Sequence, residues 1–283
     1  MKFLKGLILI LFFISCNNNG NDNNYNEEES EDIILDPQGT QYATWIMIWN
    51  RSSEDWWNPY NTVGATILVN NRWQAINWMD KYQVEEHVKN MREAGVTILI
   101  CDLTNGWNWL NNDVHYIQSL CVKNGMKVCI AENSYGDVSM FESHAYDVWH
   151  NFAKPDSPYG STYLRKEGEP VIVCYGIREW YNAYKSSNGD YAKKFNLVWA
   201  SGEDSDINKW GWQLEPWIGS VPSQDAMFVT SSIKWGVNDE DWRKSLAFLD
   251  YNFLLAKQNH PKYIIIGGYD DIHERNGWLP ANT

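Results

Sequence analysis

Apolar runs that read as buried strands alternate with amphipathic segments over most of the chain, and this alternation restricts the fold more than any other feature. Short apolar runs separated by helical patterns are typical of a parallel sheet covered by helices. The strand pattern occurs at residues 42–49, 96–102, 126–132, 170–175, 196–200, 210–214, 226–231 and 263–267. Eight strands are the number that closes a (β/α)8 barrel, so we expect this α/β fold.

The segments between these strands predict helices of uneven length. Helical patterns cover residues 83–93, 112–123, 140–152, 179–194 and 242–258. Only residues 201–209 separate the fifth and sixth strands, and only residues 269–283 follow Gly268. We therefore expect a barrel that is incomplete or irregular in its later helices. Residues 51–81, rich in Trp and Asn, are interpreted as a long loop over the mouth of the barrel.

The beginning of the chain, residues 1–16, predicts a processing signal. Lys2 and Lys5 provide a positive start, and the apolar run that follows is too short to span a bilayer. Phe-Ile-Ser-Cys, ending at Cys16, resembles the bacterial lipoprotein box, which implies that Cys16 is lipidated. The alternative is an ordinary secretory leader that contains a cysteine.

An Asn-rich and then acidic stretch, residues 17–38, has too few apolar side chains to fold. We interpret it as a disordered tether that leads to a single (β/α)-barrel domain at residues 39–283. The expected location is outside the cytoplasm, with the lipid anchor in a bacterial membrane at the cell surface or at the periplasmic face. The anchor is the membrane contact that we expect, and we expect a monomer.

Charge and cysteine usage exclude several classes of function. The net charge of −13 argues against nucleic acid as a partner. The four other cysteines form no C-x-x-C pair and are predicted to be buried free thiols rather than disulfides or zinc ligands: Cys101, Cys121, Cys129 and Cys174. His144 and His150 are six residues apart on a predicted helix, a spacing that favours surface positions over a metal site. Motifs for phosphate, dinucleotide or ester chemistry are missing, so we expect no metal and no cofactor.

The chain is rich in aromatic residues, with 17 Trp and 16 Tyr. An aromatic ring can cover the flat C–H face of a sugar, and Asn, Asp and Glu can bind its hydroxyls, so this composition is typical of a saccharide groove. We assign Trp210, Trp212 and Trp235 to such a groove. The alternative for any one of them is packing in the core.

Polar residues follow several predicted strands at their carboxyl ends. Asp102 and Asn105 follow the second strand, Glu132 ends the third and Tyr175 ends the fourth. The carboxyl ends of barrel strands converge on one mouth, so these residues are predicted to bind substrate hydroxyls. The alternatives are solvated loop polarity and helix capping.

The loop after the last strand holds the densest group of acids, Tyr-Asp-Asp-Ile-His-Glu at residues 269–274. Asp271 and Glu274 are three residues apart, and in a helical turn their Cβ atoms lie roughly 5–6 Å apart. Retaining glycosidases hold two carboxyls about 5 Å apart, and such closeness raises one pKa. We predict Asp271 and Glu274 as the catalytic pair, with Asp270 and His273 as substrate contacts.

These residues resemble the Glu-x-His-Glu loop of glycoside hydrolase family 99, the endo-α-mannosidases and endo-α-mannanases, whose fold is a (β/α)8 barrel. The resemblance implies that Asp271 acts as a base on the substrate's 2-hydroxyl, which attacks the anomeric carbon internally. It also implies that Glu274 protonates the leaving oxygen. Asp271 stands where the family has Glu and is one methylene shorter.

The predicted function is hydrolysis of an α-linked glycan, such as an α-mannan, with retention, by a lipoprotein that binds an oligo- or polysaccharide. The alternative is a glycan-binding lipoprotein that keeps the barrel but has lost turnover, which the shorter acid at position 271 favours. A hydrolase releases reducing ends from the glycan, whereas a binding protein does not.

Overall fold

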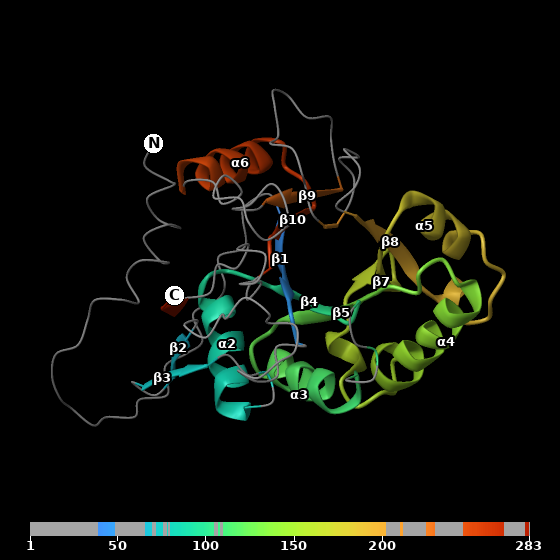
Figure 1. The fold of residues 1–283 in the computed structure, drawn as a ribbon, viewed down its shortest axis with the longest axis horizontal. Coiled ribbons are helices and arrows are strands. Elements are labelled where there is room, and N and C mark those ends of the chain that lie inside the picture. The colour runs from blue at the N-terminus through green and yellow to red at the C-terminus, as the bar shows by residue number, and fades with distance from the viewer. Residues whose placement is uncertain are drawn as a thin grey trace, which may run out of the picture.

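The computed structural model describes residues 39–48, 66–69, 72–75, 78, 80–104, 107, 110–201, 210–211, 225–229, 246–268 and 281–282. These residues build a curled, mixed α/β half-barrel (Figure 1). Its parallel strands are β1 (Gln41–Ile46), β4 (Ile98–Asp102), β5 (Lys127–Glu132), β7 (Glu169–Tyr175), β8 (Asn196–Ala200), β9 (Ala226–Val229) and β10 (Tyr263–Ile266). Each matches a strand predicted from the sequence.

The parallel strands lie side by side in the order β8-β7-β5-β4-β1-β10-β9. A short strand β6 (Arg165–Lys166) pairs antiparallel with the start of β7. Lys166 forms a 2.9 Å ion pair with Asp225, the residue before β9, so the sheet curls far enough to connect the β7 and β9 sides. The described strands form an open sheet, and closure into a complete barrel stays a prediction.

The predicted strand at residues 210–214 is described only at its first two positions. Trp210 and Gly211 form a bend rather than a strand, and residues 212–214 lie outside the described residues. The Trp210 N–H nevertheless donates to the Trp199 carbonyl of β8 over 2.7 Å. This part of the chain therefore follows the free edge of β8, where one more barrel strand would pair.

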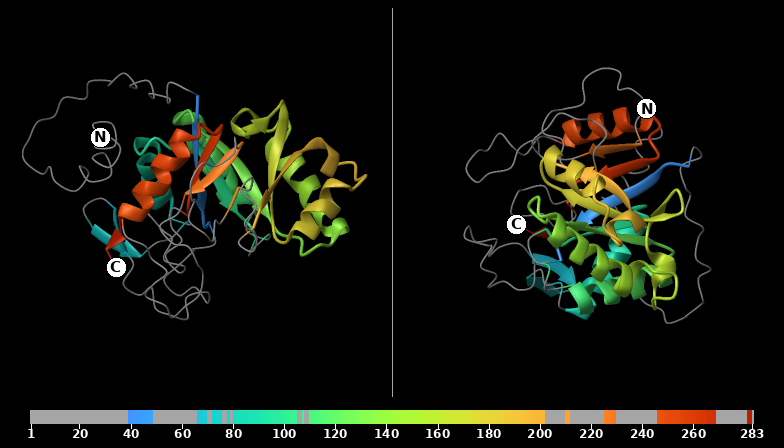
Figure 2. Two further views of the ribbon diagram at one scale, coloured as in Figure 1. Left: turned by 90° about the horizontal axis from the view of Figure 1, so that it is seen from above. Right: turned by 90° about the vertical axis from the view of Figure 1, so that its right-hand side faces the viewer.

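Five helices of the described chain accompany the sheet (Figures 1 and 2). They are α2 (Lys81–Glu93), α3 (Leu110–Lys123), α4 (Val138–Val148), α5 (Arg178–Lys185) and α6 (Leu246–Gln258). Helices α4 and α5 lie at the β7 and β8 end of the sheet, and α6 lies beside β9 and β10 at the other end. Within the described residues, no helix is long and apolar enough to cross a membrane.

Two helix ends differ from the prediction because of local contacts. Helix α4 begins early because the Asp137 carboxylate caps it, accepting hydrogen bonds from the N–H groups of Ser139 and Met140. It then widens into a π-helix at Trp149–Ala153. Helix α5 ends at Lys185 instead of reaching residue 194, and a separate 3-10 turn, η4 (Ala192–Lys194), follows it.

The separate turn η4 has a tertiary cause. The Glu142 carboxylate of α4 accepts hydrogen bonds from the N–H groups of Tyr191 at 2.7 Å and Ala192 at 2.9 Å. A side chain at Gly189 would collide with that carboxylate, so Gly189 lets the chain approach α4. A contact with a distant helix therefore overrides the local pattern that predicted one continuous helix.

The segment predicted as a long loop, residues 51–81, contains regular structure, which corrects that interpretation. Strands β2 (Thr66–Val69) and β3 (Arg72–Ala75) form an antiparallel hairpin, and β11 (Ala281–Asn282) adds a third strand beside β2. Helix α2 begins at the end of this segment because Asp80 caps it. Trp78, in the same segment, is buried and packs against His87 with ring centroids 5.0 Å apart.

The four cysteines of the described domain are buried free thiols, as predicted: Cys101, Cys121, Cys129 and Cys174. Burial raises the pKa of all four thiols, and that of Cys121 rises to about 12. Since the thiolate is the reactive form, these side chains act as core hydrophobes rather than as nucleophiles.

Candidate active site

The pairing of β4, β5 and β7 decides which predicted residues share a face of the sheet. Asp102 pairs with Ala131, and Ala131 pairs with Val173, two residues before Tyr175. Paired residues in parallel strands point to the same side, and neighbours along a strand point to opposite sides. Asp102 and Tyr175 therefore lie on one face of the sheet, and Glu132 lies on the other.

The face with Asp102 and Tyr175 is the inner face of the curl. Trp45 of β1 lies on it, with its ring edge-on to Tyr175 at 6.5 Å between centroids. Asp102 is buried at the end of β4 and accepts a 2.8 Å hydrogen bond from the Thr104 N–H through Oδ1. This bond fixes the carboxylate where the strand gives way to its loop. The inner face thus carries an acid and a phenol at the carboxyl ends of two strands.

Trp210, predicted as a substrate contact, lies in the interior of the curl. Its side chain is 2% exposed and packs against Tyr263, the first residue of β10, with ring centroids 4.7 Å apart. Its carbonyl accepts a 2.9 Å hydrogen bond from Trp45 Nε1. This environment matches the alternative of packing in the core, although Trp210 also lines the cavity beside β8.

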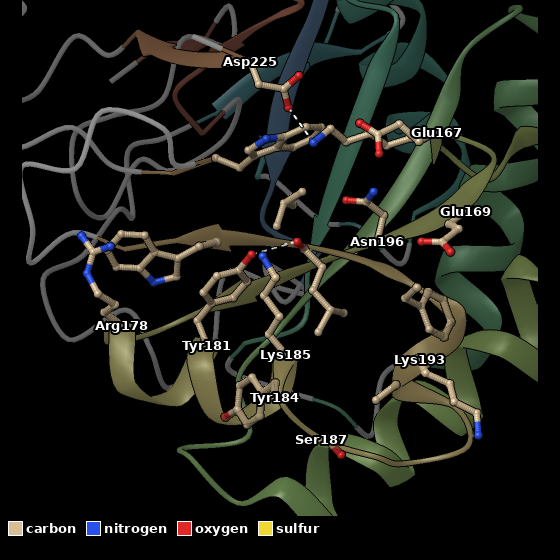
Figure 3. Close-up of a pocket in the computed structure, with 17 residues that line it drawn as sticks. Glu167, Glu169, Arg178, Tyr181, Tyr184, Lys185, Ser187, Lys193, Asn196 and Asp225 are labelled. Atoms are coloured by element: carbon tan, nitrogen blue, oxygen red, sulfur yellow. Dashed lines mark hydrogen bonds and ion pairs between the residues drawn. The ribbon is translucent and has the colours of Figure 1, made fainter.

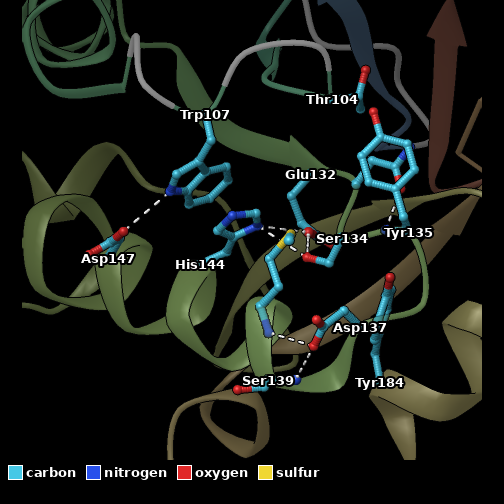
Figure 4. A network of polar contacts seen from close by, with 12 residues as sticks. Thr104, Trp107, Glu132, Ser134, Tyr135, Asp137, Ser139, His144, Asp147 and Tyr184 are labelled. Atoms are coloured by element: carbon cyan, nitrogen blue, oxygen red, sulfur yellow. Dashed lines mark hydrogen bonds and ion pairs between the residues drawn. The ribbon is translucent and has the colours of Figure 1, made fainter.

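Glu132 lies on the helix side of the sheet, at the centre of a small polar network (Figure 4). Its side chain is 0% exposed. Oε2 accepts a 2.5 Å hydrogen bond from Ser134 Oγ and lies 3.2 Å from His144 Nδ1 of α4. Ser134 Oγ is also 3.1 Å from the same His144 nitrogen. Glu132 was predicted to bind substrate at the mouth together with Asp102, but the two carboxylates point to opposite faces.

Trp107 covers the network from the loop after β4. Its ring stacks on the His144 imidazole, with centroids 3.6 Å apart and planes inclined by 17°. Its Nε1–H donates to Asp147 Oδ2, one turn further along α4, over 3.2 Å. The loop after β4 is thereby fixed to α4 through stacking at His144 and a hydrogen bond at Asp147.

Burial raises the pKa of the Glu132 carboxyl, although the hydrogen bonds from His144 and Ser134 oppose the shift. Oε1 is buried and has no hydrogen-bond partner in the described chain. A buried, half-satisfied carboxylate is costly, and protonation is the simplest way to lower that cost. Glu132 is therefore a buried acid whose Oε2 lies within hydrogen-bond distance of His144.

Glu132→Gln should change how stability depends on pH. A raised folded-state pKa means that the folded chain binds this proton more tightly than the unfolded chain does. The contribution of Glu132 to the free energy of unfolding is therefore greatest below its ordinary pKa of 4.5 and falls as the pH rises toward the folded-state value. Gln keeps the shape and carries no charge, so the stability of the variant relative to wild type should increase as the pH rises above 4.5.

Urea unfolding of both proteins at several pH values measures this difference. Glu93→Gln, an exposed change on α2, serves as the control and should follow the wild-type curve. Parallel curves for wild type and Glu132→Gln would show that the Glu132 pKa is not raised in the folded protein.

A cavity of about 560 Å³ lies along β8, from Asn196 at its start to Trp199 near its end (Figure 3). Glu169 and Asn196, the first residues of β7 and β8, line it together with Asp225, which precedes β9. Tyr181 and Lys185 of α5 form another wall. Arg178 and Trp199, near the carboxyl ends of β7 and β8, line the cavity as well, so it extends along the strands rather than lying at one end of them.

Several predicted site residues lie outside the described residues, and their roles stay predictions. They are Asp271 and Glu274, the predicted catalytic pair, with Asp270, His273, Asn105, Trp212 and Trp235, and the predicted lipidation site Cys16. Among the residues that the structure does describe, no three His, Cys, Asp or Glu side chains cluster closely enough to hold a metal ion.

Sequence reasoning missed His144, which was predicted at the surface. His144 and His150 are in fact both partly buried, and His150 Nε2 lies 3.1 Å from the Tyr191 hydroxyl. The signal available in the sequence is the i, i+3 spacing of His144 and Asp147 on α4, which places both side chains on one helix face. That spacing cannot name Glu132 and Trp107 as their partners, because those residues come from other elements.

Comparison with solved structures assigns the chain a fold like that of glycoside hydrolase family 99. Two structures of the GH99 endo-alpha-mannosidase from Bacteroides thetaiotaomicron resemble it, one of them in complex with BIS-TRIS-propane. The complex aligns with a TM-score of 0.62 and 12% sequence identity, covering 85% of this chain and 87% of that one. The other aligns with a TM-score of 0.61 and 10% identity, covering 85% and 88%.

At these identities the likeness concerns the fold alone. No family model and no curated protein matches the chain in sequence. The alignments nevertheless support the GH99-like fold that the resemblance implies, over 85% of this chain, while closure into a complete barrel stays a prediction.

Proposed function

We propose that this protein hydrolyses an α-linked glycan with retention, using Asp271 as base and Glu274 as acid. The observation that carries the proposal is the position of the acid-rich loop in a GH99-like fold. Residues 269–274 directly follow Gly268, just past the carboxyl end of β10. Strand β10 pairs with β1, and β1 pairs with β4, which ends in Asp102.

This order of strands brings Gly268, the residue before the acidic loop, to the same edge of the sheet as Asp102 and Tyr175. A retaining hydrolase needs two close carboxyls and further polar groups that hold the sugar ring. Asp102 and the Tyr175 hydroxyl are the described groups on the inner face that we assign to hydroxyl binding. α-Mannan is the first substrate to test, because the structural neighbours are endo-α-mannosidases.

A reducing-end assay tests the proposal directly. The domain at residues 39–283 is incubated with α-mannan and with α-glucans, and the anomeric form of the first product is followed by NMR. We expect release of reducing ends with retained configuration from one of these glycans. Product of inverted configuration would refute the close-carboxyl mechanism.

The second candidate function is glycan binding without turnover. The specific observation in its favour is Asp271, whose carboxylate is one methylene shorter than the Glu of the family loop. Affinity electrophoresis distinguishes the two functions: a binding protein is retarded by a glycan in the gel and releases no reducing ends at any protein concentration.

The lipid anchor is a further part of the proposal, supported by the lipoprotein-box-like residues that end at Cys16. In a bacterial host, the full chain should fractionate with membranes, whereas Cys16→Ala should leave almost all of it in the soluble or unprocessed fraction. Ser15→Ala, which keeps the cysteine, is the matched control. Equal membrane association of wild type and Cys16→Ala would contradict the anchor.

A further inference from the structure

The chain makes an unusual turn directly after β5, between Ser134 and Asp137. The Asp137 N–H donates to the Ser134 carbonyl over 2.8 Å, and the two central residues have positive φ, 50° at Tyr135 and 83° at Gly136. Two positive values define a type I′ turn, which favours Asn followed by Gly. Gly136 suits its position. Tyr135 does not, because a large side chain is strained in this region.

Several contacts hold Tyr135 in this conformation. Its N–H donates to Asn133 Oδ1 over 2.9 Å, and the Gly136 N–H donates to the Tyr184 hydroxyl over 2.8 Å. The Trp180 ring of α5 packs so closely on the turn that a Cβ at Gly136 would lie 2.7 Å from Trp180 Cδ1. The surroundings therefore stabilise a backbone that the Tyr135 side chain opposes.

The same Trp180 ring also packs on the neighbouring loop, after β7. Gly176 there has a φ of 141°, and a Cβ at that position would collide with the ring. Trp180 thus lies between the loops that follow two adjacent parallel strands. It also meets the Tyr135 ring edge-on, with centroids 6.1 Å apart and an interplanar angle of 68°.

The strained turn presents the Tyr135 ring to solvent. The side chain is 63% exposed, and Figure 4 shows it extending toward Thr104, in the loop after β4. Most exposed side chains gain nothing from a strained backbone, so strain that places an aromatic ring at the carboxyl edge of the sheet indicates a ligand contact. A ring fixed in advance loses little entropy when a ligand binds.

We propose that Tyr135, supported by Trp180, forms an outer sugar subsite on the β5 and β7 side of the active site, where it stacks on a pyranose ring of the bound glycan. The exposed ring face is apolar, and the adjacent Asn133 side chain is uncharged, which suits a neutral sugar. This subsite rests on the proposed function, because the glycan must extend from the acidic loop across the carboxyl edge.

Tyr135→Asn is the most informative variant, because it separates stability from binding. Asn tolerates the left-handed region, so the melting temperature should rise by about 1–3 °C. Loss of the ring should weaken glycan binding by about threefold to tenfold. Tyr135→Phe keeps the ring and should bind as the parent does. Tyr82→Ala, at a 71% exposed tyrosine on α2, should change neither quantity.

Binding is measured by affinity electrophoresis against α-mannan and α-glucan, in a Glu274→Gln background that keeps the glycan intact. A protein that binds one of these glycans equally well with and without Tyr135→Asn would overturn the subsite and leave the proposed function standing. A variant that loses both melting temperature and binding would assign Tyr135 a structural role instead. If the parent neither binds nor cleaves either glycan, the proposed function fails, and the subsite fails with it.

Discussion

Glu274→Gln and Asp271→Asn should each lower the rate of glycan hydrolysis by about 10²–10⁴-fold. Gln has no proton to give to the leaving oxygen, and Asn is too weak a base to activate a hydroxyl. Both variants keep the size of the native side chain, so the fold and the inner face with Asp102 and Tyr175 should persist. Initial rates of reducing-end release measure the effect, and affinity electrophoresis should show that the glycan is still bound.

Glu86→Gln, on the exposed face of α2, is the matched control and should keep the wild-type rate. An activated aryl glycoside adds a sharper test, because a good leaving group needs little protonation. The activity of Glu274→Gln should recover on this substrate, and that of Asp271→Asn should not. Wild-type activity in either variant on an unactivated glycan would remove that carboxyl from the mechanism.

Trp45→Ala is expected to lower the free energy of unfolding by about 3–5 kcal/mol. The Trp45 side chain is fully buried, and it contacts Tyr175 on β7 and the Trp210 carbonyl. Its removal leaves a large cavity inside the curl and deprives a buried carbonyl of its donor. Trp45→Phe restores part of the volume but not the hydrogen bond, so its cost should be smaller.

Chemical unfolding in urea gives these free energies, with Val122→Ala on the exposed side of α3 as the control. Val122 is half exposed, and its truncation should change stability by less than about 0.5 kcal/mol. If Trp45→Ala costs no more than this control, Trp45 does not hold residue 210 against the sheet.

The sequence predicts the parallel sheet well because buried parallel strands are continuous apolar runs. Between two helical patterns, a short apolar run fits a buried strand better than any other element, as at residues 98–101 and 263–266. The hairpin of β2 and β3 was harder to predict, since each strand is only four residues long and a third strand, β11, pairs from the far end of the chain. Pairing over such a sequence separation leaves no local pattern.

For the candidate site, the sequence predicts which residues lie at the ends of strands but not which face of the sheet they share. Asp102 and Glu132 both end buried strands, which the sequence indicates, but their faces depend on the register between β4 and β5. A shift of one residue exchanges the two faces, and no local propensity specifies that shift. The partners of Glu132 likewise come from α4 and from the turn after β5, so its burial on the helix side follows from tertiary packing.

The Trp180 ring couples the loop after β5 to the loop after β7, because it packs against a glycine in each of them. The Trp180 ring fills the space between Gly136 and Gly176. A side chain at Gly136 would push the ring toward Gly176, and a side chain at Gly176 would push it toward Gly136. A side chain at either glycine would therefore disturb both loops through this ring. A redesign of this rim therefore has to treat both loops together.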